Sequence, residues 1–417
     1  MTDNPQKEKL WNKNFFLLWQ GLLVSAMGDV IYAIALGFWI LAETGSTALM
    51  GTLMAASAAP RVIISPFAGV IVDRSDRKWL LVLMDFIRGV CVILVAVAAF
   101  TGFIEIWMVF TAGIITGVCG AFFSPAVSSS IPDIVSKSKV VKANSVFSMI
   151  HSLSGVVSNS AGGFLFQILG APLMFLVNGI SYIFSAITEL FVKIPKVVRD
   201  TAPVTFLEDL KDGFRFAWTF RGLRYLMLVA AGLNFFATMG IILLLPLFQQ
   251  YDHLGAGLYG IVMGVSTAGL FLGMLLTSLY NFKPESRFRI LMLCNFVFTI
   301  CLIILPLYLN VIYMAGLMFI VGITNAIINV FVMSTAQVTV PQDKRGKVFA
   351  LMGTMAGGLS PIAMAFGGVL AEFIPIRILI SVSFIFMGIG FIPLLFSKSF
   401  KQFTNFDPEK QKLEDIL

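Results

Sequence analysis

Two charged residues, Asp29 and Arg61, lie inside long apolar stretches of the sequence. A charged group in hydrocarbon is costly, so such residues are candidates for function wherever the stretch spans a membrane. A carboxylate that is ionised beside a cation and protonated away from it couples proton movement to a change of conformation. His151 also lies within an apolar stretch and is a third candidate for proton coupling, because an unperturbed histidine side chain changes its charge near physiological pH. The alternative for His151 is a hydrogen-bonded side chain that only packs the helix.

Asp29 and Arg61 lie at similar depths along their segments. At the rise of an α-helix, Asp29 is ~21 Å and Arg61 ~16 Å from the expected inner edge of the membrane. An arginine side chain spans that difference, so an Asp29–Arg61 ion pair is expected. Three roles stay open for Asp29: proton coupling, a permanent ion pair that fixes helix packing, and recognition of a cationic substrate.

The composition indicates which class of protein must position these residues. Of the 417 residues, 58% are hydrophobic and 12% are charged, whereas soluble proteins have about 45–50% apolar and about 25% charged residues. A membrane protein accounts for both departures, because each spanning helix needs ~20 mostly apolar residues. The net charge of +7 raises the alternative of a nucleic-acid partner, which the positions of the basic residues decide.

Apolar windows of spanning length predict twelve transmembrane helices. The first six cover roughly 15–41, 47–72, 79–100, 106–131, 141–168 and 172–192, and the second six cover roughly 224–249, 256–280, 289–308, 311–334, 347–371 and 377–397. The predicted fold class is therefore an all-α membrane protein of two six-helix bundles. Its predicted domains are an N-terminal bundle (1–192), a linker (193–223) and a C-terminal bundle with its tail (224–417).

The basic residues fix the expected orientation. All Lys and Arg residues except Arg61, Arg88 and Arg377 lie on the termini and on alternating connections between the segments. Cytoplasmic loops carry such an excess of positive charge, so both termini and the linker are predicted to be cytoplasmic, in a multi-pass protein of the cytoplasmic membrane. The positive charge faces lipid head groups and cytoplasm, which argues against a nucleic-acid partner.

The linker and the two halves carry further signals. The linker segment "FLEDLKDGFRFAWTF" mixes aromatic and charged residues, which predicts an amphipathic helix on the membrane surface, with a solvated linker as the alternative.

Pro132 and Pro341 lie about half the chain apart, as do the double glycines that begin at Gly162 and Gly367. These echoes predict a duplicated six-helix unit, an architecture of transporters whose substrate site lies between the repeats.

The connection between the second and third segments, "GVIVDRSDRK", contains Gly69, Asp73, Arg74, Arg77 and Lys78. Taken alone, its charges fit a solvated, positively charged loop. In this place, however, the pattern resembles the loop signature of the major facilitator superfamily. Other segments, including "APRVIISPFAGVIVDR" and "FFSPAVSSSIPDIV", resemble its macrolide-efflux and siderophore-exporter group, and "SPA" with "VKAN" is also similar to lysophospholipid flippases.

The resemblance implies that the loop closes a cytoplasmic gate. Asp73 would contact the N-terminal end of the helix that begins near Lys347, where the helix dipole favours a negative charge. Arg77 would then pair with a carboxylate, for which Asp133 is the nearest candidate.

Three other charged residues have expected places near the same membrane face. Asp85 and Arg88, three positions apart on one helix face, are expected to join the charge network of the gate. Glu189 is expected to form an interfacial pair with Lys193.

The polar residues predicted to line a substrate cavity are Asn234, Asn325 and Asn329. Asn325 and Asn329 face one direction because they lie four positions apart on a helix. With 40 Phe and 20 Met residues, the chain can surround them with an apolar wall. Hydrogen bonds between helices are the competing role for these amides.

The resemblance implies a secondary transporter that works by alternating access. We expect proton-coupled efflux of amphipathic small molecules such as macrolide-like drugs, by an antiporter that confers drug resistance. The alternative is a lysophospholipid flippase. The sequence has no HExxH, GxSxG or Walker-type motif, so we expect no enzyme activity, catalytic residue, metal or cofactor, and a proton gradient as the energy source. The expected partners are a small substrate and membrane lipid, with the protein a monomer.

Overall fold

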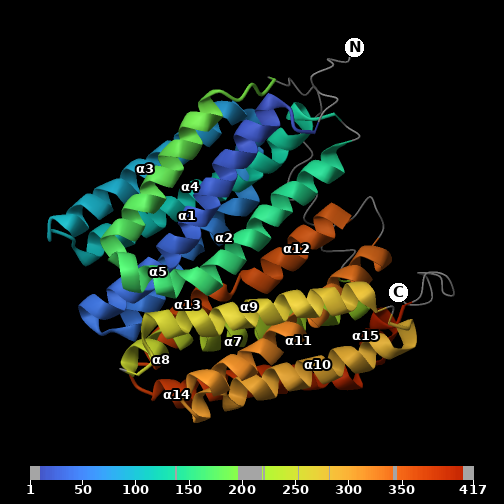
Figure 1. Cartoon of the computed structure of the whole chain (residues 1–417). Coiled ribbons are helices and arrows are strands. Elements are labelled where there is room, and N and C mark those ends of the chain that lie inside the picture. The colour runs from blue at the N-terminus through green and yellow to red at the C-terminus, as the bar shows by residue number, and fades with distance from the viewer. Residues whose placement is uncertain are drawn as a thin grey trace. The chain divides into compact units, whose positions relative to one another are not determined.

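The structure is a computed structural model that describes residues 10–136, 139–195, 218, 221–251, 253–280, 282–340 and 345–406. Every regular element among these residues is a helix, and the chain divides into two units, Met1–Pro203 and Val204–Leu417 (Figure 1). The boundary falls inside the predicted linker 193–223. Most of that linker, including the predicted amphipathic helix, lies outside the described residues.

Among the described residues, the N-terminal unit contains five helices. They are α1 (Lys13–Thr44), α2 (Thr47–Arg74), α3 (Arg77–Phe100), α4 (Ile106–Ile134) and α5 (Val140–Leu190). The long α5 holds two of the predicted segments, 141–168 and 172–192, which meet at a non-helical residue, Gly170. Its φ of 70° lies in the left-handed region that favours glycine, so the chain changes direction there.

The C-terminal unit has more breaks. Its elements are α7 (Arg221–Ile242), α8 (Leu244–Gln250), α9 (Gly255–Leu279), α10 (Pro284–Ile304), the 3-10 turn η3 (Leu305–Leu307), α11 (Val311–Thr339), α12 (Arg345–Gly357), α13 (Ser360–Leu370), α14 (Ile376–Phe396) and α15 (Lys398–Thr404). The predicted segment 224–249 is divided into α7 and α8, and 347–371 is divided into α12 and α13.

Eleven helical segments of the described residues are long and apolar enough to cross a membrane. The predicted segment 141–168 has no match of its own, because it falls on the first arm of α5, where several side chains are not described. The described residues are therefore all-helical and carry the candidate spans of a multi-pass membrane protein. The count of twelve spans and the cytoplasmic termini stay predictions.

The repeated double glycine has an equivalent place in each unit. Gly162 of α5 packs so closely on Ile34 of α1 that a Cβ there would overlap the isoleucine side chain. A Cβ on Gly367 of α13 would lie 2.9 Å from Cγ of Met239 on α7. In both units a glycine thus allows close approach to the first helix of the unit, which supports the predicted duplication.

Candidate functional site: an ionisable cavity in the N-terminal unit

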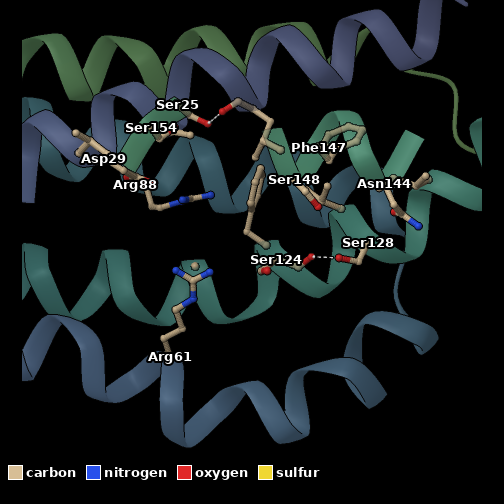
Figure 2. A pocket seen from close by; sticks show the side chains of 17 residues that line it. Ser25, Asp29, Arg61, Arg88, Ser124, Ser128, Asn144, Phe147, Ser148 and Ser154 are labelled. Atoms are coloured by element: carbon tan, nitrogen blue, oxygen red, sulfur yellow. Dashed lines mark hydrogen bonds between the residues drawn. The ribbon is translucent and has the colours of Figure 1, made fainter. Parts of the chain in front are cut away.

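A cavity of about 590 Å³ lies among the helices of the N-terminal unit. Figure 2 shows its lining from α1 to α5. Its polar lining consists of Ser25, Asp29, Arg61, Arg88, Ser124, Ser128, Asn144, Ser148 and Ser154. A membrane-embedded cavity with hydroxyl, amide and charged groups suits a ligand that has polar as well as apolar parts.

Asp29 of α1 is exposed to this cavity and accepts a hydrogen bond from the hydroxyl of Tyr182 on α5. The expected Asp29–Arg61 pair is not formed among the described residues. Arg61 of α2 is exposed, extends toward the cavity (Figure 2), and makes no hydrogen bond or ion pair within the part of the chain that the structure describes. The prediction compared depths along two helices, whereas α5, which packs extensively on α1, brings Tyr182 to the carboxylate instead.

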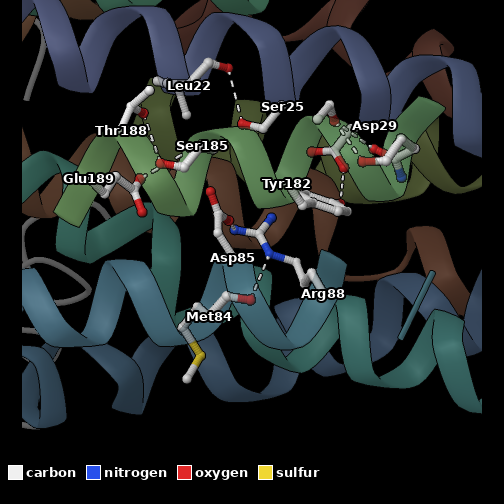
Figure 3. Close-up of polar contacts among 12 residues, drawn as sticks. Leu22, Ser25, Asp29, Met84, Asp85, Arg88, Tyr182, Ser185, Thr188 and Glu189 are labelled. Carbon is white, nitrogen blue, oxygen red and sulfur yellow. Dashed lines mark hydrogen bonds and ion pairs between the residues drawn. The ribbon is translucent and has the colours of Figure 1, made fainter. Parts of the chain in front are cut away.

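Asp85 and Arg88 form an ion pair that is buried between α3 and α5. The guanidinium carbon of Arg88 lies 4.4 Å from the ring centroid of Phe123 and 4.5 Å from that of Tyr182. Both distances are in the range of cation–π interactions. Their expected place in the charge network of the loop motif is therefore not supported: they join the network of Tyr182 and Asp29 (Figure 3).

Two glycines allow α3 and α5 to approach this closely. A Cβ on Gly89 of α3 would lie 3.1 Å from the carbonyl oxygen of Gly179 on α5, and one on Gly179 would lie 3.3 Å from that of Gly89. Any larger side chain at either position would separate the helices. Arg88, next to Gly89, is thereby held against the ring of Tyr182.

Glu189, near the end of α5, is buried, with 1% of its surface exposed. Its Oε1 accepts a long hydrogen bond of 3.5 Å from the hydroxyl of Ser185, and its Oε2 has no partner among the described residues. The predicted interfacial pair with Lys193 is wrong, because Glu189 faces α3 rather than solvent. Figure 3 shows the carboxylates of Glu189 and Asp85 on either side of Ser185.

Sequence reasoning missed Tyr182 and misplaced Glu189, although a signal was available. Asn178, Ser181, Tyr182, Ser185 and Glu189 recur at spacings of one to four residues and so form one polar stripe on α5. All five side chains are buried. A polar stripe on an otherwise apolar spanning helix marks a face that packs on other helices.

The loop motif forms one predicted contact. Arg77 pairs with Asp133, and its Nη1 donates a hydrogen bond of 2.9 Å to the carbonyl oxygen of Ser129, so the start of α3 is tied to the end of α4. The predicted Arg77–Asp133 pair is confirmed. A Cβ on Gly69 would meet no described atom within 4 Å, so this glycine makes no close helix contact among the described residues.

The rest of the motif gives less information about the gate. Arg74 is exposed and Lys78 is half-buried. The side chains of Asp73, of His151 and of the first residues of α12 (345–347) are not described, although the backbone of α12 is. The predicted gate contact and the role of His151 therefore stay predictions.

The C-terminal unit has two neighbouring cavities, of about 410 Å³ and 190 Å³. Both cavities are lined by the predicted residues Asn234 and Asn329 and by Asn295, which was not predicted. The smaller cavity is also lined by Asn325. The amide of Asn329 donates to Oδ1 of Asn325 at 2.6 Å, so the two predicted residues contact each other. The larger cavity is otherwise lined mostly by Leu, Met and Phe side chains.

Spanning helices in two units, each with its own cavity, and ionisable side chains within apolar helices define the class of polytopic membrane transporters. The described residues contain no cluster of three or more metal-ligating side chains. The sequence profile of the Major Facilitator Superfamily matches residues 18–365, and the chain belongs to this superfamily. The predicted resemblance to this superfamily is confirmed.

Similar proteins include efflux pumps. The chain is 26% identical over 378 residues to macrolide efflux protein A of Streptococcus pyogenes, covering 88% of this chain and 91% of that protein. It is 25% identical over 364 residues to the multidrug efflux pump Tap of Mycolicibacterium fortuitum, covering 84% of this chain and 87% of that protein. The fold is also similar to a solved structure of a bacterial homolog of the human lysosomal transporter Spinster, in its inward-facing, unoccupied form. The two align with a TM-score of 0.68 at 16% identity, covering 98% of this chain and 100% of that one.

Proposed function

We propose that this protein exports amphipathic small molecules across the cytoplasmic membrane in exchange for protons. The observation that carries the proposal is the carboxylate of Asp29, which is exposed to the cavity of the N-terminal unit and hydrogen-bonded to Tyr182. The efflux activities named for similar proteins, macrolide efflux protein A and the pump Tap, support export of drug-like molecules.

Asp29 has the properties that a proton carrier needs. Its exposure to the cavity gives protons access, while the hydroxyl of Tyr182 stabilises the ionised form by donating to it. Protonation removes the charge and weakens that hydrogen bond, so the two protonation states favour different contacts between α1 and α5. A change of contacts between states is the requirement for coupling.

The cavities of the C-terminal unit would supply a different kind of contact. Their apolar walls with a few amides suit the hydrophobic body of a substrate, whereas the hydroxyls and charges of the N-terminal cavity suit its polar groups. An amphipathic substrate carries groups that suit each kind of surface. In the proposed cycle, the loop motif with its Arg77–Asp133 pair serves the cytoplasmic gate.

A second candidate function, movement of lysophospholipid between leaflets, is favoured by Arg61. Its guanidinium lines the cavity and has no partner among the described residues, and guanidinium groups bind phosphate by paired hydrogen bonds. A lysophospholipid would place its phosphate at Arg61.

The two functions are separated by flux measurements on the purified protein in proteoliposomes. The panel contains a macrolide, a cationic dye and a lysophospholipid, each tested with and without an imposed pH gradient. Macrolide or dye flux that requires the gradient supports proton-coupled efflux. Lysophospholipid movement that is independent of the gradient, with no drug flux, would overturn it in favour of the flippase.

A further inference from the structure

Two buried carboxyl groups outside the proposed carrier lie close together in the N-terminal unit. Asp85 of α3 is fully buried and Glu189 of α5 is 1% exposed, and Ser185 lies between them (Figure 3). Each group has one oxygen, Oδ2 of Asp85 and Oε2 of Glu189, without a partner among the described residues. Buried carboxylate oxygens are normally paired or hydrogen-bonded, so these two need an explanation.

The charges around the pair do not balance if both carboxyls are ionised. On α3, Arg88 pairs with Asp85; on α5, Tyr182 and Ser185 face the pair. From α1, Asp29 adds a further negative charge, bonded to Tyr182. From α4, the uncharged ring of Phe123 covers Arg88, and the thiol of Cys119 lies nearby.

Arg88 is thus the cation bonded to this network among the described residues, and it neutralises one carboxylate. A second ionised carboxylate at the same buried site would be uncompensated, which is energetically unfavourable. Two carboxyls that share such a site avoid the cost by retaining one proton between them. Protonation also removes the charge from one of the two unpartnered groups, and a buried neutral carboxyl without a partner is less costly than a buried carboxylate without one.

We propose that Asp85 and Glu189 form a second protonation site, which holds one shared proton and is separate from Asp29. The proton forms an O–H bond on one of the two unpartnered oxygens, and Arg88 balances the charge of the other carboxyl. Tyr182 contacts both Arg88 and Asp29, so the charge states of the two sites are coupled. The role of this site in transport rests on the proposed function, whereas the retained proton does not.

Infrared spectroscopy of the purified full-length protein at neutral pH tests the proposal. A protonated carboxyl group has a C=O stretch that is separate from the carboxylate and amide bands. The parent should show this band, and Glu189→Gln and Asp85→Asn should each lose it, because the remaining carboxyl then ionises beside Arg88. Asp29→Asn and the surface control Glu105→Gln, at the exposed N-cap of α4, should retain it.

The result that overturns the proposal is equally direct. The proposal is wrong if the parent shows no such band, or if the band survives in Glu189→Gln or in Asp85→Asn. The parent spectrum decides the first outcome even if a variant fails to fold. The measurement needs no substrate or gradient, so a protein that exports nothing still gives a clear result. Failure of the proposed transport function is therefore distinguished from failure of the shared-proton proposal.

Discussion

The side chain of Tyr182 joins Asp29 to Arg88, two charged residues from different helices. Its hydroxyl donates a hydrogen bond to Asp29, 153 positions away in the sequence, while its ring lies 4.5 Å from the guanidinium carbon of Arg88. The tyrosine therefore contacts the cavity carboxylate at one end and the buried Asp85–Arg88 pair at the other. Any change in the charge of Asp29 is transmitted to a residue that also touches Arg88.

Tyr182→Phe removes the hydroxyl and keeps the ring. Without that donor, the hydrogen bond between Asp29 and Tyr182 is lost, so a change in the charge of Asp29 no longer alters this contact between α1 and α5. Gradient-driven transport in proteoliposomes should fall several-fold, while substrate affinity changes little. Gradient-driven transport equal to that of the parent would show that the hydrogen bond has no part in coupling.

Arg61→Ala tests whether the cavity binds an anionic group. A hydrogen bond to a charged group contributes about 1.5–3 kcal/mol, so KM for a lysophospholipid should rise about tenfold or more. KM for an uncharged or cationic drug should not change. Arg61→Lys keeps the charge but loses the paired geometry, so its KM for the lysophospholipid should lie between the values of the parent and of Arg61→Ala. Equal effects on both kinds of substrate would contradict the assignment of Arg61 to a phosphate.

Gly89→Ala tests the close approach of α3 and α5. The added Cβ would lie 2.6 Å from Cδ1 of Ile183 as well as close to the carbonyl oxygen of Gly179. Overpacking of this kind costs about 1–3 kcal/mol, so the melting temperature in detergent should fall by several degrees. The matched control is Gly316→Ala on α11, where a Cβ meets nothing within 4 Å and stability should be unchanged or slightly higher.

The Arg77–Asp133 pair is suited to a double-mutant cycle. Both side chains are about one-tenth exposed, so breaking the pair leaves a poorly solvated charge. Arg77→Ala and Asp133→Ala should each lower the free energy of unfolding. The double variant should lose about 0.5–3 kcal/mol less than the sum of the two single losses. Additive losses in thermal or denaturant unfolding would mean that the pair contributes nothing, and the gate would need another explanation.

Much of the architecture could be predicted because its physical signal is local. Apolar segments of spanning length, alternating basic connections and the repeated double glycine indicated a helical membrane protein of two similar halves. The Arg77–Asp133 pair was also predictable, since both residues lie at helix ends on the same expected membrane face. These features depend on sequence spacing and on the membrane, which impose similar constraints on every such chain.

The buried network could not be predicted in the same way. Which face of α5 meets α1 and α3 depends on tertiary packing, and spacing along the chain does not supply it. Glu189, four positions before Lys193, therefore looked like one half of an interfacial pair, although the structure turns it toward Asp85. Likewise, depth alone suggested Arg61 as the partner of Asp29, where the rotation of α5 brings Tyr182.

The most direct test of the central claim compares two kinds of flux in Asp29→Asn proteoliposomes. If Asp29 carries the coupling proton, the variant should still exchange labelled for unlabelled substrate without a gradient, as the parent does. It should fail, however, to accumulate substrate when a pH gradient is imposed. Gradient-driven accumulation at the rate of the parent would contradict the account and would leave Asp29 as a packing residue.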